Sequence, residues 1–401
     1  MNLKGPLVFR NPASRFDLPG DKGVFDRIVS DMIEHGGRLA PSEHWNWNLG
    51  TAGEHSAEKL SGYTEELFEE KYSRLDMMLN PWVGVTGMKP IDEDAVRKYE
   101  GFLRTVDHLG LLPEDTLVDG AANGWRETDL GSVMDANLIS AHSPGIPASG
   151  RAAICEVGGG YGRLAEVMTG GSADSMHYVL VDAVPGSLMY AYSYLKAQLP
   201  DHKIGSFYNG DAYSTDFDCY IIPAWHTSVL ADSSFDLCIN IESMQEMEQH
   251  HVDFYIGLFD RLAVHGGEIY LSNARDYVFQ GTWRLPDNWQ TVFLSNTPRS
   301  WTADHPTHIL YKREGDFSLP RSMHEAAFRQ QMDAWKEAQR IGELERHIAD
   351  RDRICGELQT KVERLELAGK PLDSSDKAEI RTPASRMFDW IRRRRKSRGN
   401  R

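Results

Sequence analysis

An apolar run that ends on an acid and opens into glycines constrains this chain more than any other stretch. Residues 154–157 read Ile-Cys-Glu-Val, and glycines follow at 158, 159, 160 and 162 before a helix-like segment. Glycine lets the backbone turn sharply and approach a ligand, and the first amides of the next helix are unpaired. The pattern predicts the first strand and turn of a nucleotide-binding α/β domain. A dinucleotide fingerprint would need glycine at 163, where Arg163 stands, and this argues against a dehydrogenase.

Two further β-rich runs also end near acids. Residues 177–182 close on Asp182, and residues 204–209 are followed by Asp211 and Ala212. The carboxyl ends of parallel strands meet at one edge of a sheet, so we expect Glu156, Asp182 and Asp211 to form one site. Asp182 is placed to grip both ribose hydroxyls of a nucleoside, and Asp211 to accept from an adenine amino group.

The spacing Glu156-x-Gly158-x-Gly160-x-Gly162 resembles motif I of the class I S-adenosylmethionine-dependent methyltransferases. The resemblance implies S-adenosyl-L-methionine as the cofactor. With the strand ends and the fourth strand, it implies a cofactor site of Glu156, Gly158, Gly160, Tyr161, Gly162, Asp182, Asp211, Ala212 and Asn240.

Strands alternate with helical segments from residue 151 to about residue 312, which predicts a parallel sheet with right-handed crossovers. We expect an α/β fold with a Rossmann-like class I methyltransferase sheet, mostly parallel with an antiparallel last strand. The expected strands are 152–157, 177–182, 204–209, 235–240 and 267–272, followed by 291–295 and 307–312.

Four short runs narrow the resemblance. Residues 240–247 read Asn-Ile-Glu-Ser-Met-Gln-Glu-Met, and these together with 270–273, 298–301 and 305–309 are similar to the sugar O-methyltransferase family of polysaccharide and glycolipid gene clusters. The similarity covers roughly residues 40 to 315. It implies that the acceptor is a sugar hydroxyl of a glycan or glycolipid and that the chain serves polysaccharide biosynthesis.

Methyl transfer to an alcohol requires a base near the acceptor oxygen. Glu246 is the preferred candidate because it lies inside the 240–247 run, and His250 and His251 are the alternatives. An exposed acid in the first turn of a helix is the ordinary explanation of Glu246. We expect no metal, because no Asp-Asp pair follows the fifth strand. The expected acceptor contacts are Trp45, Asn273, Arg275, Trp301 and His305.

Two of these acceptor contacts have a structural alternative. Trp45, between polar residues, suits stacking on a sugar face, but a tryptophan is more often part of a core. Asn273 at a strand end is equally well explained as a cap.

The flanking regions differ from this domain. Residues 1–150 carry helical patterns, notably 24–33 and 63–79, and read as a helical cap or substrate region; residues 125–150 within it read as a linker or lid. The methyltransferase domain is expected at 151–315, a helical segment at 316–369, and a linker with a basic amphipathic tail at 370–401.

Two patterns in the C-terminal part suggest partners. Apolar residues at heptad spacing over 341–365 predict a coiled coil and a homo-oligomer, with a single helix lying on the body as the alternative. Residues 384–401 join a short apolar face to a block of cations, which suits an anionic membrane surface, a solvated tail being the plain alternative.

Charge is distributed unevenly along the chain. The net charge is −15, yet residues 386–401 carry eight Lys and Arg against one acid, so the rest sums to −22. An acidic folded part of this kind would repel the phosphates of a nucleic acid, so we expect no nucleic-acid partner. No stretch is long and apolar enough for a membrane span, so we expect a cytoplasmic protein, peripheral at the inner face of the membrane if the tail binds there.

Two other functions fit the same sequence. One is a small-molecule O-methyltransferase of natural-product tailoring, which differs only in its acceptor. The other is a non-enzymatic coiled-coil scaffold with a methyltransferase-like domain, which predicts no turnover.

Overall fold

The computed structural model describes one part of the chain: residues 6–7, 9, 15–41, 65–79, 100–101, 103–113, 125–143, 151–170, 176–274, 283, 285–295 and 306–313. The chain divides into two compact units, residues 1–321 and 322–401, and every described residue belongs to the first. The expected coiled coil over 341–365 and the basic tail over 384–401 lie outside the described residues. So do Trp45, Arg275, Trp301 and His305.

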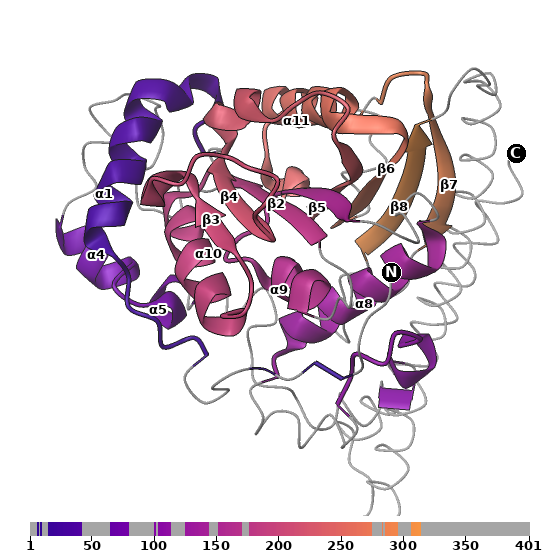
Figure 1. Ribbon diagram of the computed structural model, residues 1–401, viewed down its shortest axis with the longest axis horizontal. Helices are drawn as coiled ribbons and strands as arrows, with labels where there is room; N and C mark the ends of the chain where they lie inside the picture. Colours follow the sequence, from indigo (N-terminus) through magenta and orange to yellow (C-terminus); the bar gives the residue numbers. More distant parts are fainter. Residues whose placement is uncertain are drawn as a thin grey trace, which may run out of the picture. The chain divides into compact units, whose positions relative to one another are not determined.

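A mixed sheet of eight strands forms the centre of this unit, in the order β3-β4-β2-β1-β5-β6-β8-β7 (Figure 1). The first six strands along the chain are parallel, and β8 runs antiparallel to β6 and β7. The expected mostly parallel sheet with an antiparallel end is therefore confirmed. The strands are β1 (Ala152–Val157), β2 (Met176–Asp182), β3 (Ile204–Ser206), β4 (Cys219–Pro223), β5 (Phe235–Ile241), β6 (Ala263–Ala274), β7 (Trp289–Ser295) and β8 (Pro306–Arg313).

The expected third strand, 204–209, is wrong in its extent and its place. Only Ile204–Ser206 is extended, and residues 207–209 turn into the 3-10 helix η5 (Phe207–Asn209). The strand beside β2 is instead β4, which was not among the expected strands. The β4 segment is a short apolar run ending in a proline, and only the one-turn helix η5 separates it from β3, so it lacks the strand–helix alternation that marked the other strands.

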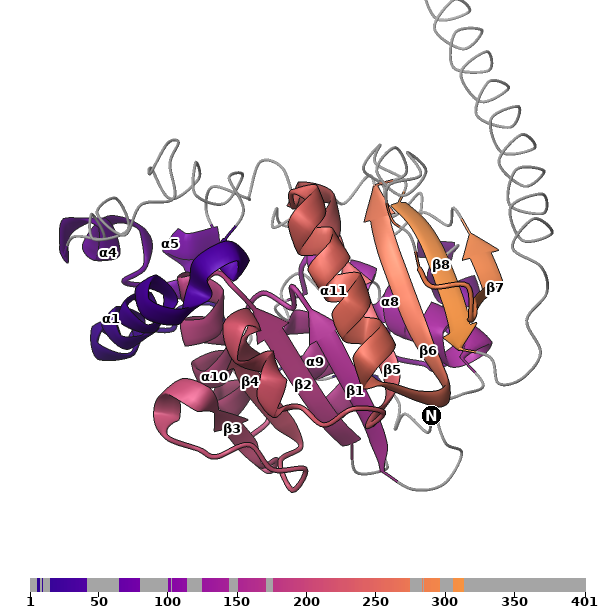
Figure 2. The ribbon, with the colours of Figure 1, turned by 90° about the horizontal axis from the view of Figure 1, so that it is seen from above.

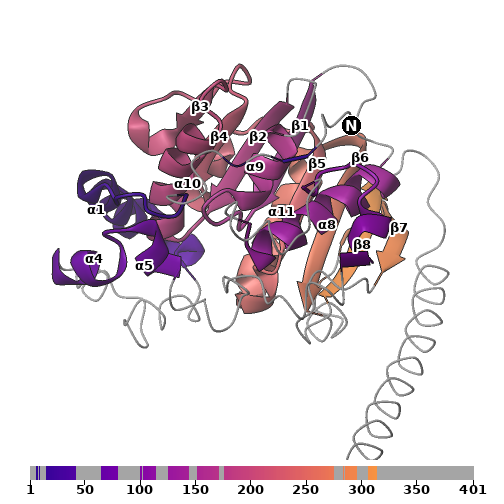
Figure 3. The same cartoon turned by 90° about the horizontal axis from the view of Figure 1, so that it is seen from below.

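Helices cover both faces of the sheet. On one face lie α8 (Glu127–His142), α9 (Arg163–Gly170) and α10 (Pro185–Gln198), which Figure 3 shows in front of the strands. On the other face lies α11 (Gln249–Leu262), seen in front in Figure 2. Both faces are apolar, as parallel strands require.

The N-terminal helices pack beside α10. The expected helix over 24–33 is confirmed as α1 (Lys22–Asp31), which continues into one π-helical turn, η2 (Met32–Gly36), and one 3-10 turn, η3 (Gly37–Leu39). The pattern over 63–79 forms two helices, α4 (Glu65–Lys71) and α5 (Leu75–Leu79). None of the helices within the described ranges has the length and apolar character that crossing a bilayer demands.

The expected linker over 125–150 is wrong for residues 127–142, which form α8. Its small and polar residues weakened the helical signal, because Gly, Ser and Asn are poor helix formers. Burial compensates: the described side chains from 128 to 137 are all buried. Packing against the sheet therefore overrides the weak local preference of this segment.

A buried arginine ties the N-terminal segment to the helices below the sheet. Arg15 forms ion pairs with Asp129 of α8 at 2.8 Å and with Glu166 of α9 at 2.6 Å, and its side chain is fully buried. Its guanidinium lies 3.6 Å from the centroid of the Phe9 ring, and Glu166 also accepts from the Tyr194 hydroxyl at 2.5 Å. Removing the cation would leave two buried carboxylates unbalanced.

We expect Arg15→Met to destabilise the protein by about 3–5 kcal/mol, because breaking a buried ion pair leaves an uncompensated charge. The matched control is Arg74→Met, since Arg74 pairs with Asp17 and Asp76 on the surface with 48% of its side chain exposed. Urea unfolding followed by circular dichroism measures both. Equal shifts in the two variants would show that the Arg15 cluster does not anchor the N-terminal segment.

Candidate functional site

The site lies where the strand order reverses. From β1 the chain proceeds outward to β2 on one side, and later to β5 and β6 on the other. Open parallel sheets bind ligands at this switch point, outside the carboxyl ends of the strands. The loop after β1 occupies it, and Gly158, Gly160 and Gly162 have φ angles of +74°, +57° and +95° there. Residues with a Cβ rarely adopt such angles, which explains why the loop is built of glycine.

The loop is packed on one side and open on another. A Cβ on Gly158 would lie 2.0 Å from the Oγ of Ser243, so the loop after β5 rests directly on the glycine loop. Among the described residues, no atom lies within 4 Å of the position that a Cβ on Gly160 would take. No described residue therefore blocks the approach of a ligand to the backbone at Gly160.

Asp182 holds this loop in place. Its Oδ2 accepts from the amide of Gly160 at 3.0 Å, and its Oδ1 accepts from the amides of Ala183 at 2.7 Å and Val184 at 2.8 Å. Burial raises the pKa of Asp182 to about 6, while the three amides oppose the shift. Oδ2 has one amide partner among these bonds, so it retains acceptor capacity for a hydroxyl group.

Glu156 lies beneath the same loop and is 4% exposed. Its Oε2 accepts from the Tyr178 hydroxyl at 2.8 Å, and a Cβ on Gly159 would lie 2.7 Å from that oxygen. Burial raises the pKa of Glu156 to about 7, with the Tyr178 hydrogen bond opposing the shift. Glu156 therefore changes charge near neutral pH.

Asn240 and Asn273, which were expected to contact ligands, form hydrogen bonds within the protein. The amide nitrogen of Asn240 donates to the Val157 carbonyl at 2.8 Å and to the Ser243 hydroxyl, and its oxygen accepts from Asn273 at 3.0 Å. Both asparagines are fully buried. They join the ends of β5 and β6, and this burial argues against direct contact of Asn273 with a sugar.

Tyr161 and Asp211 also differ from expectation. The Tyr161 ring is 7% exposed and packs edge-on against Tyr194 with ring centroids 4.9 Å apart, so its side chain faces the core below the loop. Asp211, followed by Ala212, comes after the edge strand β3 and accepts from the Ser206 amide at 3.0 Å. Since β4 lies between β3 and β2, Asp211 does not occupy the strand end next to Asp182.

The residues at that strand end were not among those expected at the cofactor site. Trp225 and His226 follow β4 in the 3-10 helix η6 (Ala224–Val229), and both reach Asp31 of α1. The Asp31 carboxylate accepts from Trp225 Nε1 at 2.7 Å, His226 Nε2 at 3.0 Å and the Tyr208 hydroxyl at 2.6 Å. Burial opposes ionisation, but these hydrogen bonds lower the pKa of Asp31 overall. The acid at this strand end comes from α1 and not from the strand itself.

The predicted bases follow β5. Glu242 adopts φ +54°, an unfavourable angle for a residue with a Cβ, and this turn leads into η7 (Met244–Glu246). Glu246 is half-buried there, three residues beyond Ser243. The structure therefore places Glu246 on the loop that rests on Gly158.

The two histidines contact the N-terminal segment instead. His250 is exposed and its Nε2 lies 3.2 Å from the Arg38 carbonyl, while His251 is 4% exposed and its Nε2 lies 3.0 Å from the Ala40 carbonyl. Burial, and then His250, lower the pKa of His251. Both rings hold residues 38–40 against the start of α11.

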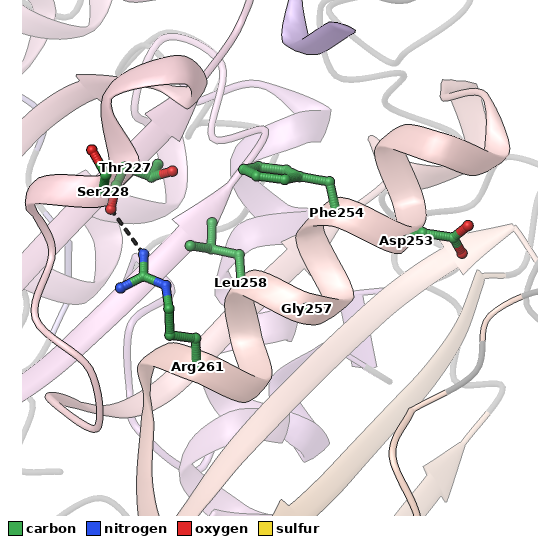
Figure 4. A pocket seen from close by; sticks show the side chains of 7 residues that line it. All are labelled: Thr227, Ser228, Asp253, Phe254, Gly257, Leu258 and Arg261. Atoms are coloured by element: carbon green, nitrogen blue, oxygen red, sulfur yellow. Dashed lines mark hydrogen bonds between the residues drawn. The ribbon is translucent and has the colours of Figure 1, made fainter.

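A groove of about 550 Å³ lies elsewhere, between η6 and α11 (Figure 4). Arg261 crosses it to donate to the Thr227 carbonyl at 2.9 Å. Its lining does not include the glycine loop or Asp182. We therefore do not assign the groove to the candidate site.

We expect the free energy of unfolding to depend on whether Glu156 is protonated. Its folded pKa, about 7, lies above its ordinary 4.5, so the native state holds a proton that the unfolded chain releases. This contribution is complete below about pH 4.5 and is lost as pH rises through 7, by roughly 3 kcal/mol at about 1.4 kcal/mol per pKa unit. Glu156→Gln should flatten the fall in unfolding free energy between these pH values.

Urea unfolding at a series of pH values measures this slope. The control is Glu70→Gln, because Glu70 is exposed on α4 and its replacement should leave the slope of the natural protein intact. A slope in Glu156→Gln equal to that of the natural sequence would assign the buried proton to another group.

No family model matches the sequence, and no curated protein matches it. Solved structures with partial similarity include a candidate S-adenosyl-L-methionine-dependent methyltransferase from Methanococcus maripaludis, with 12% identity and a TM-score of 0.34 over 57% of this chain and 96% of that one. Another is Haemonchus contortus phosphoethanolamine N-methyltransferase 1 with S-adenosylhomocysteine, with 11% identity and a TM-score of 0.32 over 62% and 56%. A third is an S-adenosylmethionine-dependent methyltransferase from Mesorhizobium loti, with 12% identity and a TM-score of 0.29 over 45% and 98%.

Proposed function

We propose that this chain is an S-adenosyl-L-methionine-dependent methyltransferase. The observation that carries the proposal is the glycine loop at the β1/β5 switch point, open at Gly160 and fixed by Asp182. The loop fits such a cofactor because Gly160 offers an unobstructed backbone and Asp182 Oδ2 retains acceptor capacity for a ribose hydroxyl. Trp225, half-buried after β4, offers an aromatic surface in the position first given to Asp211.

For the acceptor, we propose a sugar hydroxyl of a surface polysaccharide or glycolipid. Support comes from the similarity of residues 240–247 to the sugar O-methyltransferases. The bound cofactor supplies an electrophilic methyl group. Glu246 takes the proton of the attacking hydroxyl, since its loop rests on the glycine loop through Ser243. A carboxylate within reach of the acceptor hydroxyl can take this role.

The C-terminal part extends the same proposal. Self-association through 341–365 and binding of an anionic membrane by 384–401 would bring the enzyme to a lipid-linked acceptor. Partitioning of the full chain and of a chain lacking 384–401 onto anionic liposomes compares the two directly.

We expect Gly160→Ala to weaken cofactor binding at least tenfold, since its new methyl group enters the space where the ligand would lie. The matched control is Gly110→Ala. Gly110 has φ +66° against +57° for Gly160, and a Cβ on either would have no atom of a described residue within 4 Å. Both changes therefore add similar backbone strain. Calorimetric titration with S-adenosyl-L-methionine and S-adenosylhomocysteine measures the affinities.

Equal affinities in Gly160→Ala and Gly110→Ala would place the ligand away from the loop. No heat with either compound in the natural, folded protein would overturn the methyltransferase proposal and favour the scaffold.

We expect Glu246→Gln to lower the rate of methyl transfer by roughly 10²–10⁴-fold, the usual effect of removing a general base. Cofactor affinity should stay unchanged, because Glu246 is assigned to the acceptor side. The control is Asp253→Asn, an exposed acid on α11. Transfer of a labelled methyl group measures the rate, and full activity in Glu246→Gln would remove it as the base.

The same assay separates the acceptor classes. A panel of nucleotide sugars, glycans and phenols, each with labelled cofactor, shows which hydroxyl is methylated. Methylation of phenols alone would reject the sugar and favour natural-product tailoring.

A further inference from the structure

Three side chains at the start of α11 gather ligand atoms that suit a metal ion. Glu248, His250 and His251 each offer one such atom, and the three atoms lie within 4.8 Å of one another. His250 is exposed and one-third of the Glu248 side chain is exposed, so an ion can enter from solvent. Imidazole and carboxylate groups are common ligands of divalent transition metals.

Hydrogen bonds fix which nitrogen of each ring is available. Nε2 of His251 lies 3.0 Å from the Ala40 carbonyl, and Nε2 of His250 lies 3.2 Å from the Arg38 carbonyl. A carbonyl only accepts, so each Nε2 carries a proton and donates it. The Nδ1 atoms are left as the candidate ligands. Metal-binding histidines are typically oriented by just such a bond from the second nitrogen.

Nδ1 of His251 has an environment that hydrogen bonds do not explain. It is buried, it has no hydrogen-bond partner in the described part of the chain, and it lies 2.7 Å from Oε2 of Glu248. When the ring is neutral, both of these atoms are electron-rich and repel each other. A cation or a proton must therefore separate them.

A cation between Nδ1 of His251 and Oε2 of Glu248 would bind both atoms at once, and a neutral imidazole is the form that binds a metal ion.

We propose that Glu248, His250 and His251 form a binding site for a divalent transition metal ion of the zinc type. Zinc lies about 2.0–2.2 Å from nitrogen and oxygen ligands, which places tetrahedral ligands about 3.3 Å apart. The 2.7 Å contact must open accordingly, and the partly exposed Glu248 side chain can move to do so. Three protein ligands leave further coordination positions for water or another ligand. This site departs from our sequence-based expectation of no metal.

A second cluster provides the comparison. Asp31, His35 and His226 also offer three ligand atoms within 4.8 Å. Hydrogen bonds account for that cluster, however: His35 Nδ1 lies 2.9 Å from Asp31 Oδ1, and His226 Nε2 lies 3.0 Å from both oxygens. Asp31 also accepts from Tyr208 and Trp225. No repulsive pair is present among these contacts, so the cluster serves as an internal control.

Cobalt(II) titration of the tag-free, full-length, chelator-treated protein tests the proposal, with visible absorption as the readout. We expect one equivalent of Co²⁺ to bind, Zn²⁺ to displace it, and Zn²⁺ to raise the melting temperature. His250→Gln, at an exposed position, and His251→Gln should each weaken binding at least tenfold and reduce the thermal shift. His35→Gln should leave both readouts unchanged.

Absence of Co²⁺ absorption and of a Zn²⁺-dependent thermal shift in the natural protein would overturn the proposal. So would unchanged binding in both His250→Gln and His251→Gln, or its loss in His35→Gln alone, which would assign the ion to the other cluster. These measurements use neither cofactor nor turnover, so their result is independent of the proposed methyltransferase activity.

Discussion

The buried carboxylate of Asp182 is the interaction on which the site depends. It binds the amides of Gly160, Ala183 and Val184, so one side chain fixes the loops after β1 and β2 together. Burial opposes its ionisation and raises its pKa to about 6, but the amides keep the charged form accessible. With the glycine loop held in this way, Ser243 packs directly against Gly158, and this contact positions the loop after β5.

The N-terminal segment provides a second constraint, from outside the sheet. Residues 31–40 meet the end of β4 through Asp31 and the start of α11 through the carbonyls of Arg38 and Ala40. These contacts join two loops on opposite sides of the switch point. A segment that sequence analysis assigns to a cap is therefore part of the framework that positions the loops around the site.

Features that depend on residues close together in the sequence could be predicted, and those that depend on distant residues could not. The sequence predicted the glycine loop, β2 and the antiparallel end of the sheet because each depends on a pattern of neighbouring residues. β4 was missed because five residues ending in proline carry little periodicity. The two carboxylates that pair with Arg15, and Trp225 and His226, which bind Asp31, lie more than 110 residues away from these partners, and no local pattern encodes such pairs. The glycine-loop residues were predicted from local pattern, whereas the buried position of the Tyr161 ring was not visible in the sequence, and the structural role of Asn273 was one of two equal alternatives there.

The charge around the glycine loop bears on which cofactor it suits. Glu156 and Asp182 both lie buried beside the loop, and both hold pKa values raised by burial, to about 7 and about 6. A diphosphate placed against these acids would be repelled, or would require both to stay protonated. A cofactor that brings positive charge would instead favour their ionised forms. The sulfonium and ammonium groups of S-adenosyl-L-methionine supply that charge, so the electrostatics of the loop and its departure from the dinucleotide fingerprint at Arg163 favour the same class of ligand.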